Sequence, residues 1–160
     1  MNRAREAETF WQRGGGWVLA QCVLMAAVVG ASFLRTGRFD PPAAVRVLGT
    51  LAMSWGAAVG IAGAWVLRGS RTIFPKPKPE ARLVTTGIYA RVRHPLYSSL
   101  MGLTWGWGCW VGSWPVLAAA AALTALLGFK ARHEERWLVE RFPEYADYAR
   151  RVARFIPGLW

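Results

Sequence analysis

Three long stretches without charged side chains set the strongest limit on how this chain can fold. Residues 14–34 and 47–67 are each 21 residues long and contain no Asp, Glu, Lys or Arg, and residues 95–129 form a third such stretch of 35 residues. A helix needs about 20 apolar residues to cross the hydrocarbon core of a bilayer. The first two stretches therefore each predict one membrane-spanning helix, and the third is long enough for two short ones.

Turn-forming residues in the middle of the third stretch indicate a helical hairpin. Gly112, Ser113 and Pro115 lie near its centre, and such residues favour a tight turn. Each arm is then about 17 residues long, which is the lower limit for a crossing. We predict an all-α integral membrane bundle of four transmembrane helices, with a short hairpin formed by the third and fourth helices.

The composition and the placement of charge agree with a membrane protein. The chain has 160 residues, of which 54% are hydrophobic and 18% charged, and its formal net charge is +11. That length predicts a single domain, with the first two spans in residues 1–72 and a polar loop, the hairpin and the C-terminal helices in residues 73–160. Because the basic residues lie at the edges of the apolar stretches, we expect no nucleic-acid partner.

The basic residues also predict the orientation of the bundle. Residues 68–93 contain seven Lys and Arg against one Glu, and residues 130–160 contain seven against five acids, whereas the hairpin turn contains none. Loops rich in Lys and Arg stay on the cytoplasmic side of a membrane. We therefore expect both termini, and any site built from these two segments, on the cytoplasmic side, with membrane lipids around the bundle.

The step from His94 to Pro95 marks the start of the third stretch and indicates an anion-binding site. Proline favours the first position of a helix and pushes the preceding residue out of helical geometry, so we expect His94 to cap this helix. Free amides at a helix N-terminus attract anions, and Arg91 and Arg93 add cationic donors nearby. The alternative is that both arginines only anchor the helix in anionic lipid.

The C-terminal segment predicts two further helical parts. Charged residues at four-residue spacing continue the last apolar stretch from Lys130 onward, so the fourth helix is expected to leave the membrane without a break. Farther on, Tyr145, Tyr148, Val152 and Phe155 form an apolar stripe opposite three arginines. That pattern is typical of an amphipathic helix on a membrane surface.

Two features of the first two stretches bear on packing. Gln21 either bonds to a neighbouring helix or faces a substrate cavity, and the sequence leaves both possibilities open. Small residues recur every four positions along the second stretch, at Ala52, Gly56, Gly60 and Ala64. Such spacing allows another helix to approach closely.

Glu134 and the two histidines are the remaining polar groups of interest. Glu134 lies about one turn beyond the last apolar stretch, where an acid is costly unless it has a partner. His94 and His133 lie on separate segments, and the chain has no motif with metal-ligand spacing. We expect no metal site.

Two motifs in the C-terminal half carry a resemblance to a known family. Residues 83–97 read LVTTGIYARVRHPLY, and residues 133–157 read HEERWLVERFPEYADYARRVARFIP, with an uncharged hairpin between them. In this order and separation they resemble the isoprenylcysteine carboxyl methyltransferase family, integral membrane enzymes related to phospholipid N-methyltransferases. The resemblance implies an S-adenosylmethionine-dependent methyltransferase and makes the loop before the hairpin a cofactor-binding loop.

The position of each residue in these motifs implies a role. The implied cofactor contacts are Arg82, Leu83, Val84, Tyr89, His94, Pro95, Leu96, Tyr97 and Glu134, with Arg93 as a further cationic donor beside them. In the family, an arginine lies one turn before this glutamate, and the arginine holds the substrate. Here Lys130 takes that position and Arg132 lies close by, so we assign both to the acceptor, although lysine lacks the bidentate fork of arginine.

The methyl acceptor stays open at this point. A carboxylate is already ionised, a thiol needs a lowered pKa, and an amine must first lose a proton, for which Glu135 would be the base. We expect a lipidic or small apolar acceptor, and the short, Arg- and Ala-rich chain suggests a bacterial inner membrane. Two other hypotheses are an NADPH-dependent membrane reductase of the sterol-reductase type and a scaffold without enzymatic activity.

Overall fold

The computed structural model describes residues 9–68 and 83–159, and this part of the chain is all-helical, as predicted. It contains five α-helices and one short 3-10 helix: α1 Gly15–Ala31, α2 Ala43–Val66, η1 Gly87–Ala90, α3 Pro95–Val111, α4 Trp114–Arg141 and α5 Tyr145–Arg151. The first four α-helices coincide with the predicted apolar stretches. The fourth continues well past its apolar part, as the spacing of its charged residues predicted.

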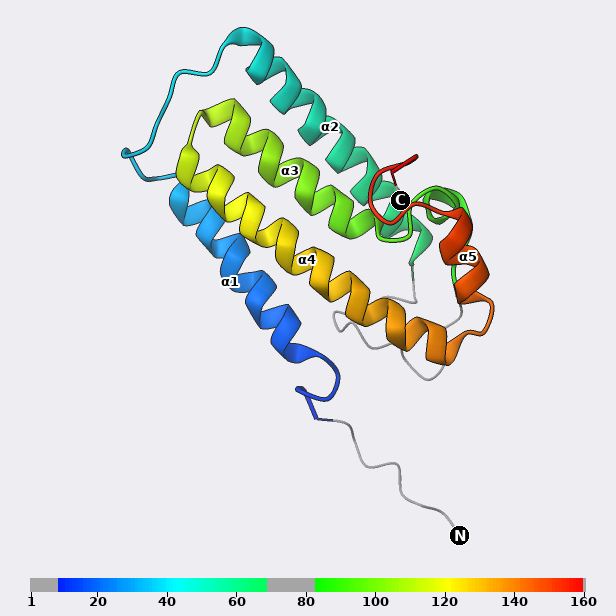
Figure 1. Ribbon diagram of the computed structural model, residues 1–160. Helices are drawn as coiled ribbons and strands as arrows, with labels where there is room; N and C mark the ends of the chain where they lie inside the picture. The colour runs from blue at the N-terminus through cyan, green and yellow to red at the C-terminus, as the bar shows by residue number, and fades with distance from the viewer. Residues whose placement is uncertain (1–8, 69–82, 160) are drawn as a thin grey trace.

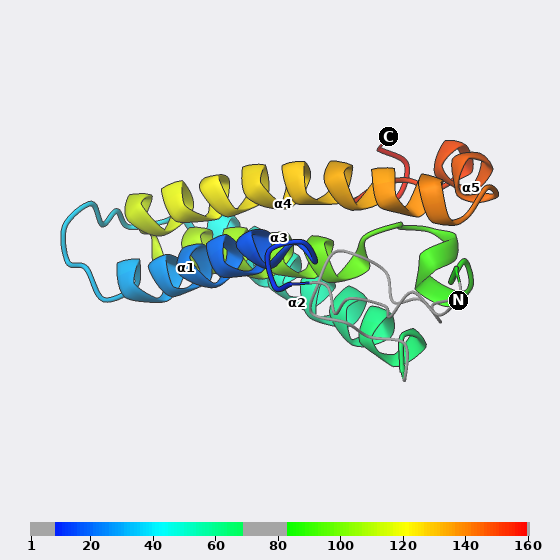
Figure 2. The ribbon, with the colours of Figure 1, turned by 90° about the horizontal axis from the view of Figure 1, so that it is seen from below.

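The four long helices lie alongside one another (Figure 1). Helix α3 packs between α2 and α4, and α1 packs against α4. Seen from below, α4 extends beyond the other helices toward α5 and the C-terminus (Figure 2). The polar last turns of α4 therefore reach the same end of the bundle as η1 and the start of α3.

The turn between α3 and α4 is where the sequence predicted it. Gly112 ends α3 with a left-handed φ of 63°, a conformation that glycine adopts without strain. Ser113 begins α4, and its side chain accepts a hydrogen bond from the amide of Val116. The amide of Phe39, from the loop between α1 and α2, donates to the Gly112 carbonyl at 2.8 Å. The predicted hairpin is thus confirmed, and the preceding loop is tied to it.

Glycines allow α2 and α3 to pack in close contact. A Cβ atom on Gly56 would lie 2.9 Å from the Ser99 carbonyl, and one on Gly106 would lie 2.5 Å from the Gly49 carbonyl. Both distances are too short for any side chain. The predicted close approach at Gly56 is confirmed, and the contact extends further toward the hairpin turn than the four-residue repeat indicated.

The outer surface of the bundle is strongly apolar. Helices α2 and α4 are long and apolar enough to cross a membrane, and only 22% and 33% of the residues in their most apolar windows are buried inside the protein. Large hydrophobic side chains point outward along the bundle, among them Val23 on α1 and Leu51 and Ile61 on α2. Apolar surface of this extent indicates a lipid environment. The four crossings and their direction stay predictions, since α1 and α3 have 17 residues each.

The C-terminal segment differs from the predicted amphipathic helix. Helix α5 ends at Arg151, and Val152 is extended. Tyr145, Tyr148 and Val152 are buried against the protein itself, where Leu83, Leu138 and Phe142 cover them. The helix ends early because the chain beyond it hydrogen-bonds to the segment before α3, which requires an extended backbone. The expected apolar stripe on the membrane surface is therefore wrong for these residues.

Candidate functional site

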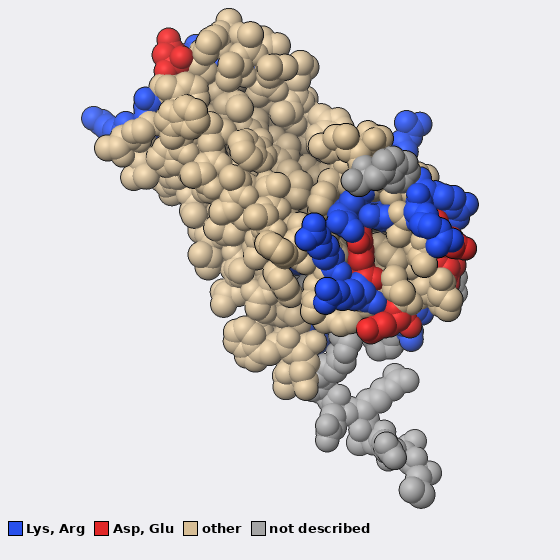
Figure 3. Space-filling view, in the orientation of Figure 1, with Lys and Arg blue, Asp and Glu red and all other residues tan. Residues whose placement is uncertain are grey.

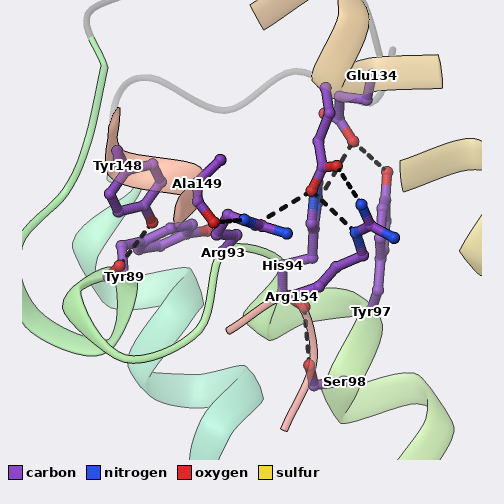
Figure 4. Close-up of polar contacts among 10 residues, drawn as sticks. Tyr89, Arg93, His94, Tyr97, Ser98, Glu134, Tyr148, Ala149 and Arg154 are labelled. Carbon is purple, nitrogen blue, oxygen red and sulfur yellow. Dashed lines mark hydrogen bonds and ion pairs between the residues drawn. The ribbon is translucent and has the colours of Figure 1, made fainter. Parts of the chain in front are cut away.

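Charged side chains gather at one end of the bundle. Figure 3 shows Lys and Arg around the end that carries α5, with acidic atoms between them, whereas the long side of the bundle in this view is uncharged. A smaller charged group lies at the opposite end. The α5 end combines the start of α3, the last turns of α4 and the segment after α5, and Figure 4 shows the polar contacts among them.

The backbone at the start of α3 is held by the C-terminal segment. Pro95 occupies the first turn of α3 and His94 is its N-cap residue, as predicted. The amides of Arg93 and His94 donate to the carbonyls of Ala153 and Arg154 at 2.9 and 3.1 Å. These hydrogen bonds join the first motif near its end to the second motif near its end, although the paired residues are 60 positions apart in the chain.

Ser98 strengthens the same connection. Its side chain is buried, and its hydroxyl lies 2.6 Å from the Phe155 carbonyl and 3.0 Å from the His94 carbonyl. The single hydrogen of this buried hydroxyl thus has two carbonyl acceptors in reach. The segment after α5 thus forms one wall of the polar cluster instead of lying free on the bilayer.

Glu135 is the centre of the ionic contacts. Its carboxylate accepts two hydrogen bonds from Arg154, at 3.1 and 2.7 Å, and lies 3.1 Å from His94 Nε2 and 3.2 Å from Arg93 Nε. Its side chain is only 13% exposed. A carboxylate bound by three donors is poorly placed to accept another proton, so the geometry favours a structural role for Glu135 over the expected role as a base.

Glu134 has a different environment from its neighbour. Its Oε2 atom accepts a hydrogen bond from the Tyr97 hydroxyl at 2.9 Å and lies 3.7 Å from His94 Nδ1. The rings of His94 and Tyr97 stack, with their centroids 5.3 Å apart and their planes 2° from parallel. Within the described residues no arginine or lysine lies within ion-pair distance of Glu134, whose side chain is 23% exposed. The nearest partners of this carboxylate in that part of the chain are thus a phenol and an imidazole.

Lys130 lies one turn before Glu134 and is 4% exposed. Its ammonium donates to Gln21 Oε1 at 2.7 Å and lies 5.1 Å from the centre of the Tyr97 ring. Arg132 lies apart from Lys130 and Tyr97. Its side chain is exposed, and its guanidinium faces the Phe129 ring at 5.9 Å. Of the two residues expected to hold the acceptor, the structure places only Lys130 beside Tyr97 and close to Glu134.

The expected cofactor contacts before α3 lie on a different side of the cluster. Tyr89 is buried in η1, and its carbonyl accepts a hydrogen bond from the Tyr148 hydroxyl at 2.6 Å. Burial raises the pKa of Tyr148 to about 12, so the phenol stays neutral and can donate. Leu83 packs on the buried face of α5, and Val84 is partly buried. The Leu83 side chain and the Tyr89 carbonyl thus both contact α5.

The other expected contacts have mixed positions. Leu96 and the buried Pro95 pack against Gly63 of α2. The Arg93 guanidinium donates to the Ala149 carbonyl as well as facing Glu135. Arg82 lies outside the described residues. The motif residues thus divide into a group around Glu134 and a group that builds the surrounding scaffold.

Sequence patterns missed two members of the cluster. Arg154 was expected on the solvent face of an amphipathic helix, and Gln21 had no assigned partner. Neither is marked by a local pattern, because Arg154 meets Glu135 only after the chain has turned back beyond α5, and Gln21 meets Lys130 across 109 residues. The adjacent acids Glu134 and Glu135 at the end of an apolar helix were the available signal, because buried carboxylates need cationic partners.

Comparison with known proteins decides the family. The family model described as phospholipid methyltransferase matches residues 44–145, well over half of the chain. The chain belongs to the phospholipid methyltransferase family. This family includes the isoprenylcysteine carboxyl methyltransferase-like proteins, so the resemblance found in the two motifs is confirmed. The match covers α2 to α4 with the whole first motif and the beginning of the second, and it leaves out α1.

Two bacterial proteins are similar to most of the chain. The cobalt-zinc-cadmium resistance protein CzcN of Cupriavidus metallidurans is 34% identical over 163 residues, covering 99% of this chain and 70% of that protein. The nickel-cobalt-cadmium resistance protein NccN of Alcaligenes xylosoxydans xylosoxydans is 35% identical over 151 residues, covering 92% of this chain and 65% of that protein. The chain thus spans about two thirds of the length of these relatives. Among its described residues, no three His, Cys, Asp or Glu side chains come together as a metal site.

Proposed function

We propose that this protein is a membrane methyltransferase that takes its methyl group from S-adenosylmethionine. The observation that carries the proposal is the contact between the two motifs: Tyr97 of the first donates to Glu134 of the second at 2.9 Å, with the His94 ring stacked on Tyr97. Membership of the phospholipid methyltransferase family supports the reaction class.

The chemistry of the cluster suits this cofactor. S-adenosylmethionine carries an ammonium, a carboxylate, a sulfonium and an adenine. Glu134, which accepts from the neutral hydroxyl of Tyr97 and has no ion pair with Lys or Arg in the described residues, suits the ammonium. The N-terminus of α3 suits the carboxylate, and an aromatic face attracts a sulfonium.

The protein groups then act by binding and orientation. When bound, the cofactor supplies a methyl group on a sulfonium, which an acceptor atom takes with its own electron pair while the sulfur keeps the electrons of the broken bond. Such a displacement needs the reacting atoms in line and little water between them. His94 and Tyr97 hold Glu134 in place, and the apolar bundle beside them keeps the acceptor in a dry environment.

We further propose that the bundle crosses a bacterial inner membrane four times. The clustering of Arg and Lys at the α5 end supports a cytoplasmic location for the cluster and both termini (Figure 3). The acceptor would be a lipid or a small apolar molecule that approaches from the bilayer, because the sides of the bundle next to the cluster are apolar and exposed. Both curated relatives come from bacteria.

Binding measurements separate this proposal from its two competitors. Calorimetric titration of the purified chain in detergent with S-adenosylmethionine should show saturable binding, and titration with NADPH should show none. Saturable binding of NADPH alone would support the reductase hypothesis, and binding of neither ligand would support the scaffold. Incorporation of radiolabelled methyl groups from S-adenosylmethionine into a bacterial lipid extract would then identify the acceptor fraction.

The names of the relatives suggest a physiological setting. We propose that methylation by this protein serves a bacterial response to divalent transition metals, as the cobalt, zinc, cadmium and nickel resistance of the relatives implies. A strain that lacks the protein should grow more slowly in cadmium or cobalt. The wild-type chain should restore growth and the Glu134→Gln chain should not. Equal restoration by both chains would contradict a role for methylation in resistance.

A further inference from the structure

The buried ammonium of Lys130 lies where three helices meet. Gln21 of α1 accepts one of its hydrogens at 2.7 Å, the Tyr97 ring of α3 lies 5.1 Å away, and Lys130 itself belongs to α4. Lysine has three N–H donors, and within the described residues only the one to Gln21 has a hydrogen-bond partner. A cation that is 4% exposed is costly beside an apolar bundle, even with a neutral amide as hydrogen-bond partner and the Glu134 carboxylate one turn away. Such a group commonly marks a functional site.

Gln21 is unusual in its own helix. Helix α1 contains no charged residue and only one side-chain amide, and that amide oxygen reaches Lys130. Its neighbours Cys22 and Val23 are exposed on the outer surface. Helix α1 also lies outside the residues that match the family model. The Gln21 contact therefore adds a helix from outside the matched region to the polar cluster.

We propose that Gln21 is a positioning residue that directs the ammonium of Lys130 toward the methyl acceptor, and that the site so formed selects an anionic head group over an amine. This inference rests on the proposed methyltransferase function. An amide oxygen that accepts one N–H fixes the direction of the other two, which can then meet the oxygens of an anion. A second cation placed beside Lys130 in a poorly screened environment would be repelled.

Two single-chain amphiphiles of equal length, radiolabelled palmitate and hexadecylamine, test the choice of head group. Binding to the purified full chain in detergent is measured for each. Palmitate should bind saturably to the wild-type protein, hexadecylamine should bind at least about tenfold more weakly, and Lys130→Gln should lose palmitate binding. Equal binding of the two amphiphiles, or palmitate binding that survives Lys130→Gln, would overturn the proposed selection.

Two substitutions of Gln21 distinguish positioning from simple packing. Gln21→Leu removes the acceptor of the hydrogen bond and should weaken palmitate binding about tenfold. Gln21→Glu keeps the link between α1 and α4 as an ion pair but neutralises Lys130, so it too should weaken palmitate binding while the unfolding temperature is maintained. A purely structural Gln21 would instead leave palmitate binding intact in Gln21→Glu, and that result would overturn the proposal. Val23→Ala, an exposed change on the same helix, is the matched control.

Cofactor titrations keep this test separate from that of the proposed function. The affinity for S-adenosylmethionine should be equal in wild type, Gln21→Leu and Gln21→Glu, because Gln21 bonds to Lys130, which we assign to the acceptor and not to the cofactor. A loss of cofactor affinity equal to the loss of palmitate binding would overturn the acceptor role. If the wild-type chain bound no S-adenosylmethionine, the proposed function would fail, whereas the dependence of palmitate binding on Gln21 would still be measured.

Discussion

The two ends of the bundle use arginine in different ways. At the end with the hairpin turn, Arg38 donates to the carbonyls of Leu34, Ser32 and Val111, and Arg46 forms an exposed ion pair with Asp40. At the other end, arginines converge on one carboxylate that is largely buried. The first end uses charge to close loops, and the second uses it to hold one largely buried glutamate.

The contrast between the two adjacent glutamates sharpens this difference. Glu135 is bound by Arg154 and His94 and lies against Arg93, whereas Glu134 accepts from a tyrosine hydroxyl and has no comparable ion pair in the described residues. Glu135 thus links the C-terminal segment to the start of α3, and Glu134 is the acid that we propose for the cofactor ammonium. Substitutions at the two ends, and along the α2 and α3 contact that joins them, should separate these roles.

The largest effect is expected at Glu135. Glu135→Gln removes the charge that compensates Arg93 and Arg154 in a largely buried site, and such a loss destabilises a protein by about 3–5 kcal/mol. We expect a clear fall in the free energy of unfolding, measured by denaturant titration in detergent. A stability within about 0.5 kcal/mol of wild type would show that the cluster does not hold the C-terminal segment.

A somewhat smaller effect is expected where α2 meets α3, because the register of α3 sets the position of both ends. A methyl group at position 106 would press on the Gly49 carbonyl, so Gly106→Ala should lower the free energy of unfolding by about 1–3 kcal/mol. The matched control is Gly128→Ala in α4, where no atom lies within 4 Å of the added carbon. That control should be neutral or slightly stabilising, since alanine favours a helix. Equal losses in both variants would contradict the close packing.

The third effect concerns binding and not stability. Glu134→Gln keeps the shape of the side chain and an acceptor for the Tyr97 hydroxyl but removes the charge offered to the cofactor ammonium. The affinity for S-adenosylmethionine should fall about tenfold or more by calorimetry, while the free energy of unfolding changes little. An unchanged affinity would place the cofactor elsewhere.

The smallest effect is expected at the hairpin end. The side chains of Arg46 and Asp40 are 51% and 92% exposed, and exposed ion pairs contribute about 0–1 kcal/mol. Asp40→Asn should therefore leave both the unfolding curve and the affinity for S-adenosylmethionine within error of wild type. A loss as large as that of Glu135→Gln would abolish the distinction between the two ends.

Much of the helical framework follows from local sequence. The uncharged stretches located the four long helices, Gly112 and Ser113 located the hairpin turn, and Pro95 located the start of α3. Each depends on a property of neighbouring residues, such as a missing amide or a left-handed backbone, that acts over a few positions. For that reason these features were predictable without any knowledge of what packs against them.

The composition of the polar cluster was only partly predictable. The two motifs indicated His94, Tyr97 and Glu134 through a family resemblance, and the structure brings these three together. It also leaves the Arg132 side chain exposed and shows the Tyr89 carbonyl as the acceptor of a hydrogen bond from Tyr148 of α5. Helical periodicity placed Arg154 on the solvent face, but the hydrogen bonds of the extended C-terminal segment direct it to Glu135.

The amino-acid sequence by itself determined the four long helices, the hairpin turn between α3 and α4, and the apolar stretches that indicate a membrane, because each depends on interactions between close neighbours or with the solvent. Tertiary structure alone decided which of two adjacent glutamates is bound by arginines and which accepts from a tyrosine hydroxyl, and which helix supplies the partner of Lys130. Those choices depend on side chains up to 109 residues apart, and no local pattern carries information about contacts made only after the helices have packed.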